Sequence, residues 1–173
     1  MDSQVNLYTE RAKNEITISE KLREMSETDE VRTFMRIPED MTFYSAVISH
    51  SYYSIFYSAK AILLTKGVRT HSPDVHSKTL QAFKERLVDT GILDTKLLEI
   101  YKKLVIRADE LLGIFVEEKR KRGDFTYKTI PQANREPAED SLANAKIFLS
   151  NINRVIEKMG MQNKQQTSHQ SSP

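Results

Sequence analysis

The sequence contains no cysteine and no tryptophan, and only four histidines occur among its 173 residues. Without cysteine the chain can form no disulfide bond, offers no thiol nucleophile and cannot build a cysteine-ligated zinc or iron–sulfur site. The four histidines are scattered through the sequence, so they offer few ligands for a metal. We therefore expect neither a metal site nor another cofactor.

Long apolar runs are also missing, since none approaches the roughly 20 residues that a membrane-spanning helix needs. The polar, acidic start of the chain lacks the regions of a signal peptide. We therefore expect no membrane attachment and a cytoplasmic location. A chain of this length with 39% hydrophobic residues can bury one core. This predicts a single domain over residues 1–159, followed by a polar tail at 160–173 that we expect to be disordered.

The charges are nearly balanced, with 26 basic and 24 acidic side chains and a net charge of +2. Overall charge therefore gives no reason to expect nucleic-acid binding. The sharpest cluster is KRKR at residues 119–122, which precedes Gly123 and Asp124. It is either a solvated helix end, where cations complement the helix dipole, or a group that grips phosphate oxygens.

Apolar residues recur every three to four positions along most of the chain, and strand-like alternation is almost absent. The pattern predicts an all-α protein, an up-and-down antiparallel bundle of four to five helices. We expect long helices to begin near residue 5, at Pro38, at Ser72 or Asp74, at Asp94 and at Pro137. We expect them to end near Ser26, at Gly67, at Gly91, at Gly123 and at Gly160. A short helical piece is also expected near Val31 and Phe34.

The expected second long helix carries four aromatic side chains at spacings of three and four residues, which places them on neighbouring faces. They are Tyr52, Tyr53, Phe56 and Tyr57. Packing in a core or a dimer interface is one explanation. The other is a tyrosine face on which a nucleic-acid base stacks.

This helix and three later motifs resemble a known family. The segment SYYSIFYSAKAILLTKG at residues 51–67 is similar to the signature helix of HEPN domains, often written with a YYAMFHAA-like core. The motifs HSKTLQAF at 76–83, RKRGDF at 120–125 and EDSLANAKIF at 139–148 resemble later elements of the family in the same order. The likeness spans about residues 37–156 and puts His76 in the place of the family's histidine in the second motif.

The resemblance implies a small helical bundle, commonly a homodimer, associated with nucleotide binding or with RNA cleavage in defence and toxin–antitoxin systems. It also implies a frequent partner, a minimal nucleotidyltransferase protein. The ribonuclease members resemble one another in a late arginine followed, after four to six residues, by a histidine. This chain lacks that pair, because none of the residues that follow Arg120 and Arg122 can exchange a proton near neutral pH as histidine does.

Other residues depart from the ribonuclease pattern or offer a substitute for it. Tyr57 stands where many relatives have histidine. Arg69 precedes His76 by the right number of residues, but this pair lies between the second and third long helices rather than late in the domain. His76 is the one fallback catalytic residue, and its alternative role is a structural hydrogen bond at a helix start. His50 is expected to make a half-buried polar contact.

Three hypotheses follow for the function. The first is a HEPN-like nucleotide- or RNA-binding module of a toxin–antitoxin system, acting with a nucleotidyltransferase-like partner and without catalysis of its own. Its candidate binding residues are Tyr53, Tyr57, His76, Lys78, Arg120, Arg122 and Asp124. The second is a metal-independent ribonuclease toxin with a non-standard active site. The third is a helical dimerisation or interaction protein without a ligand.

Overall fold

The computed structural model describes residues 3–112 and 134–169, and within these ranges it contains helices and no strand. The all-α prediction is therefore confirmed. The helices are α1 (Ser3–Glu27), α2 (Asp29–Met35), α3 (Tyr44–Thr65), α4 (Val75–Phe83), which continues as a π-helical turn (Lys84–Val88), α5 (Thr95–Leu112) and α7 (Arg135–His169). No helix in this part of the chain is both long and apolar enough to cross a membrane.

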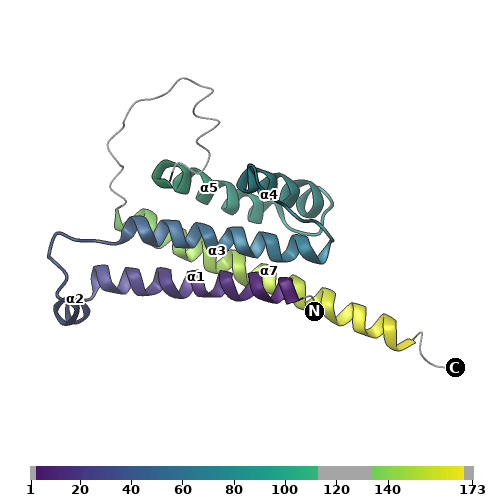
Figure 1. The fold of residues 1–173 in the computed structure, drawn as a ribbon, viewed down its shortest axis with the longest axis horizontal. Helices are drawn as coiled ribbons and strands as arrows, with labels where there is room; N and C mark the ends of the chain where they lie inside the picture. Colours follow the sequence, from purple (N-terminus) through teal and green to yellow (C-terminus); the bar gives the residue numbers. More distant parts are fainter. Residues whose placement is uncertain (1–2, 113–133, 170–173) are drawn as a thin grey trace, which may run out of the picture.

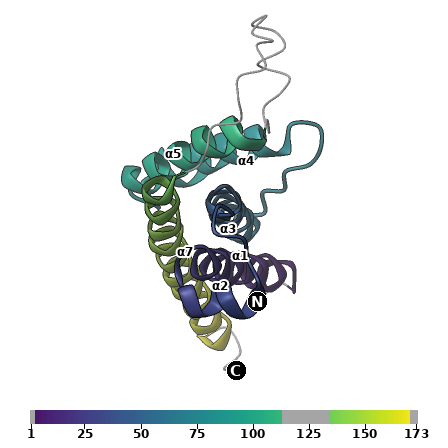
Figure 2. The ribbon, with the colours of Figure 1, turned by 90° about the vertical axis from the view of Figure 1, so that its left-hand side faces the viewer.

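The four long helices alternate in direction, so that α1, α3, α5 and α7 run up and down along the molecule (Figure 1). Helix α3 contacts α1, α4, α5 and α7. The end-on view shows it between α1 on one side and the α4–α5 pair on the other, with α7 alongside (Figure 2). Its central position explains why its apolar side chains occur on several faces rather than one stripe.

Small side chains line the contact between α1 and α3, where Ala12, Ser19, Ser51 and Ser54 are all buried. The hydroxyl of Ser54 donates to the carbonyl of Ala12 at 2.9 Å, and that of Ser19 donates to the carbonyl of Val47 at 2.9 Å. Small side chains let two helices approach closely, and each buried hydroxyl here has a partner. The pair therefore has a defined register, which decides which side chains of α1 meet those of α3.

Three aromatic rings join the other helices of the bundle. Phe83 of α4 lies 5.6 Å from Tyr101 of α5 and 5.4 Å from Phe148 of α7, measured between ring centroids. The Tyr101 and Phe148 centroids are 5.8 Å apart, and all three side chains are fully buried. Tilted and edge-on contacts of this kind add to the free energy of burial. They seat α4 and α5 against α7 on one side of α3.

The end of α3 was predicted correctly and its beginning was not. After Thr65, Gly67 takes a φ of 71° while Val68 donates its N–H to the carbonyl of Leu63, which is the Schellman stop expected at a glycine. Helix α3 begins at Tyr44 rather than at Pro38. The guanidinium of Arg32 donates to the carbonyls of Pro38, Glu39 and Met41, and these bonds hold the segment as a loop.

Other expected boundaries can also be compared with the structure. Asp94 caps α5, because its carboxylate accepts the N–H of Lys96 at 2.7 Å. Asp74 stands at the start of α4 with a φ of 59°, but its side chain makes no capping bond. The expected helix end at Gly160 is wrong, since α7 continues to His169. The expected end at Gly123 lies outside the described residues.

Candidate functional site

The side chain of His76, on α4, lies against aromatic rings of α3. Its Nδ1 is 2.6 Å from the hydroxyl oxygen of Tyr52, and its ring centroid is 4.4 Å from that of Phe56. Tyr52 and Phe56 are one turn apart on α3 and both are buried, whereas the imidazole is half-buried. Because the two aromatic residues are one turn apart on the same helix, both of their side chains contact the imidazole.

The surroundings keep both members of this pair uncharged. Burial raises the pKa of the Tyr52 phenol, and the neighbouring Tyr53 and Asp109 raise it further. Burial also lowers the pKa of His76, and the positive charge of Lys60 lowers it further. At neutral pH a protonated phenol therefore faces a neutral imidazole. The phenol can donate its proton to Nδ1, which leaves the proton of the imidazole on Nε2.

A row of half-buried rings leads away from His76 towards α1. The His76 and Tyr53 centroids are 6.2 Å apart, those of Tyr53 and Tyr57 are 6.2 Å apart, and those of Tyr57 and Tyr8 are 6.0 Å apart. The tyrosine rings lie within 28° and 19° of parallel in the last two pairs. Three helices thus contribute to one aromatic row, which carries three phenol hydroxyl groups.

Two cations border this aromatic row. The Lys60 ammonium lies 4.9 Å from the centroid of Tyr8 and 5.6 Å from that of Phe56, and it donates to the carbonyl of Thr70 at 3.3 Å. The Arg11 guanidinium carbon lies 5.7 Å from the centroid of Tyr57. Cations over the faces of aromatic rings are attracted by the ring electrons. The result is a surface that combines aromatic faces with positive charge.

The structure brings together three of the seven candidate binding residues, Tyr53, Tyr57 and His76. Lys78 is exposed on α4, and the other three candidates, Arg120, Arg122 and Asp124, lie outside the described residues. The guanidinium of Arg69 donates to the side chain of Gln4 at 2.6 Å, so it is engaged at the start of α1. His50 makes the half-buried polar contact expected of it, 2.6 Å from a carboxylate oxygen of Glu15.

Sequence reasoning missed Tyr8, Arg11 and Lys60 as parts of this site. Tyr8 lies at helical spacing from Val5 and Ala12, and this pattern is typical of the core face of a helix. Arg11 and Lys60 look like ordinary charged residues on helices. The available signal was the position of Lys60 one turn after Phe56, which predicts that the ammonium lies beside the aromatic cluster.

A second polar cluster joins α5 to α7. Arg107 donates to the carboxylate of Asp140 at 2.6 Å and to the hydroxyl of Ser141 at 3.0 Å, and Lys103 lies 2.7 Å from the same carboxylate. Burial tends to raise the pKa of Asp140, but the hydrogen bonds from Lys103 and Arg107 outweigh it, and the pKa is lowered. The cations here are already paired, so the cluster is a structural link between helices.

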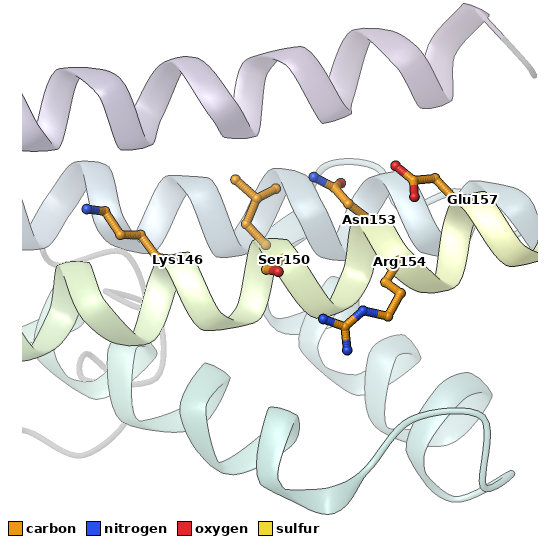
Figure 3. A pocket seen from close by; sticks show the side chains of 6 residues that line it. Lys146, Ser150, Asn153, Arg154 and Glu157 are labelled. Atoms are coloured by element: carbon orange, nitrogen blue, oxygen red, sulfur yellow. The ribbon is translucent and has the colours of Figure 1, made fainter.

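No group of three or more potential metal ligands occurs among the residues that the structure describes. Beside α7 there is a shallow hollow of about 450 Å³ (Figure 3), and its lining side chains come from successive turns of that helix. They are Lys146, Leu149, Ser150, Asn153, Arg154 and Glu157. None of the candidate site residues lines this hollow. The aromatic row on α1, α3 and α4 is therefore the candidate site.

The fold and this site define an all-α bundle protein with a histidine held in an aromatic cluster on its second long helix. The chain belongs to the HEPN domain family, whose profile matches residues 35–155. A Thermotoga maritima protein named "UPF0332 protein" is 30% identical over 114 residues, covering 66% of this chain and 74% of that protein.

Two further relatives come from Methanocaldococcus jannaschii, and each carries the name "Putative toxin". One is 27% identical over 116 residues, which cover 67% of this chain and 73% of the relative. The other is 30% identical over 114 residues, which cover 66% of both proteins. No solved structure matches the chain.

Proposed function

We propose that the protein is a nucleotide- or RNA-binding HEPN module of a toxin–antitoxin system. The observation that carries the proposal is the cluster of His76, Tyr53 and Tyr57 on one surface, with Lys60 beside it. Tyrosine rings can stack on bases, and a nearby cation can bind phosphate. The names of the two archaeal relatives support the toxin–antitoxin setting.

Binding is tested by the melting temperature of the protein with increasing nucleotide or single-stranded RNA. A ligand that binds only the folded state stabilises it by linkage, so the melting temperature rises with ligand concentration. We expect the shift to shrink in His76→Ala. His71→Ala is the matched control, since His71 is an exposed histidine in the preceding loop. An equal shift in both variants, or none in the native protein at millimolar nucleotide, contradicts the proposal.

A metal-independent ribonuclease is the second candidate function, and the state of His76 favours it. A lowered pKa keeps the imidazole neutral, as a general base requires. The bond to Tyr52 counts against it, because a phenol that donates to Nδ1 leaves a proton on Nε2. Incubation with labelled total RNA and a chelator decides between them. Cleavage that disappears in His76→Ala identifies the enzyme, whereas intact RNA favours the binding module.

The proposed assembly is a homodimer in the cytoplasm that acts with a minimal nucleotidyltransferase. Support comes from the family resemblance and from apolar surface on α2, where Phe34 is 88% exposed and Met35 is 50% exposed. Light scattering of the purified protein tests the dimer, and co-purification with a co-expressed nucleotidyltransferase tests the partner. A monomer mass at micromolar concentration contradicts the dimer.

A further inference from the structure

Helix α1 lies outside the region that matches the family, which begins at residue 35, yet it supplies one ring of the aromatic row and one of the two cations beside it. Tyr8 extends the row by one ring beyond Tyr57, and Arg11 lies beside the Tyr57 ring. Their positions follow from the close α1–α3 contact, in which Ser54 donates to the carbonyl of Ala12. The register of this helix pair therefore holds Tyr8 and Arg11 against α3.

The two cations at this end of the aromatic row form no ion pair with a carboxylate within residues 3–112 and 134–169. Neither Arg11 nor Lys60 has an ion-pair partner among the described residues. The nearby Glu15 pairs with His50, and Glu10 pairs with Lys13 at 2.8 Å. Cations of this kind beside stacked rings match the chemistry of a phosphate next to a base.

The length of the aromatic row indicates the size of the ligand. Four rings follow one another from His76 through Tyr53 and Tyr57 to Tyr8, with centroid steps of 6.2, 6.2 and 6.0 Å. A mononucleotide has one base and can occupy only part of such a row. A single strand presents successive unpaired bases and phosphates, whereas a duplex hides its base faces in its own stack.

We infer that α1 completes the binding face as a subsite for single-stranded nucleic acid, with Arg11 and Lys60 contacting a phosphate and Tyr8 and Tyr57 contacting the adjoining base. This inference rests on the proposed function and narrows its ligand from nucleotides in general to a strand of several nucleotides. The inference also adds α1, a helix outside the region that matches the family, to the binding site.

The test measures fluorescence anisotropy with a labelled 2′-O-methyl uridine strand of about 12 nucleotides. This probe lacks a free 2′-hydroxyl nucleophile, so binding is separated from cleavage. We expect Arg11→Gln to lower the slope of log affinity against log salt by about 0.7, since one phosphate contact is lost. We expect Tyr8→Leu to weaken binding about fivefold, which is the low end for loss of one stacked base.

Lys13→Gln is the matched control for Arg11→Gln. It also removes a cation from α1, but one that is exposed and already paired with Glu10. Its affinity should stay within twofold of the native value, and its salt slope should equal the native slope. Melting temperatures within a few degrees of the native protein show that each variant is folded.

The outcomes separate this inference from the proposed function. If the strand binds, and His76→Ala weakens it while Arg11→Gln and Tyr8→Leu do not, the α1 subsite is wrong and the proposed function stands. If the native protein binds no strand and no nucleotide, the proposed function fails. Equal affinity for a uridine mononucleotide and for the strand contradicts the inference that the ligand is a strand of several nucleotides. Tighter binding of the strand than of the mononucleotide, with this difference lost in Arg11→Gln and in Tyr8→Leu, supports the α1 subsite.

Discussion

Tyr52 and Tyr101 offer a direct measurement of what one buried hydrogen bond contributes to this fold. Both tyrosines are fully buried, but among the residues that the structure describes only one of the two hydroxyls has a hydrogen-bond partner. The Tyr52 hydroxyl lies 2.6 Å from Nδ1 of His76, whereas the Tyr101 hydroxyl has no hydrogen-bond partner in the described structure. Substitution of each by phenylalanine removes one oxygen atom and leaves the ring in place.

The two changes should have opposite effects on the free energy of unfolding. Tyr52→Phe removes a bond worth about 0.5–1.5 kcal/mol net and leaves a half-buried imidazole nitrogen without its phenol, so we expect a loss of about 1–2 kcal/mol. Tyr101→Phe removes a buried hydroxyl that has lost its hydration and has gained no hydrogen bond in the described structure. We expect no loss there, and a gain of up to about 1 kcal/mol.

Urea denaturation at pH 7.5 measures both variants. With a denaturant dependence of about 2 kcal/mol per molar, typical of a small protein, the midpoint of Tyr52→Phe should fall by roughly 0.5–1 M. The midpoint of Tyr101→Phe should stay or rise. A midpoint for Tyr52→Phe equal to or above that of Tyr101→Phe would refute the assignment of a stabilising Tyr52–His76 bond.

Three further predictions follow from charged groups. The pKa of His76 is lowered from 6.5, so the free energy of unfolding should fall as the pH drops through 6.5. Urea denaturation at a series of pH values should show this fall in the native protein and not in His76→Gln. The lowered pKa of Asp140 implies that Asp140→Asn costs up to about 1 kcal/mol at pH 7, and thermal melts should show this difference vanishing as pH falls below 3.8. Arg32→Lys should expose residues 36–43 to faster limited proteolysis, because an ammonium cannot reproduce the fork of bonds to several carbonyls; unchanged cleavage would count against this role.

Boundaries set by local chemistry could be predicted from the sequence. Gly67 stops α3 because a left-handed residue is needed there, and Asp94 caps α5 through a bond to an N–H two residues ahead. The two wrong boundaries have different causes. The start of α3 is set by Arg32, six to nine residues before the carbonyls it binds. For the continuation of α7 through Gly160, the described contacts offer no physical explanation.

The types of residue in the candidate site could be predicted from the sequence, but only some of the residues that form it could be named. The aromatic spacing on one helix places Tyr52, Tyr53, Phe56 and Tyr57 on neighbouring faces whatever the rest of the chain does. The composition likewise excludes thiol chemistry whatever the fold. These conclusions hold because they depend on covalent content and on the geometry of a single helix.

The tertiary structure alone decided which residues from different helices meet. Tyr52 and His76 are separated by 24 positions, and Tyr8 meets Tyr57 only because buried serines hold α1 against α3 in one register. A helical period shows that a side chain lies on an apolar face, but it cannot show what that face packs against. That choice depends on the packing of all the helices together, and it placed Arg11 and Lys60 beside the tyrosines.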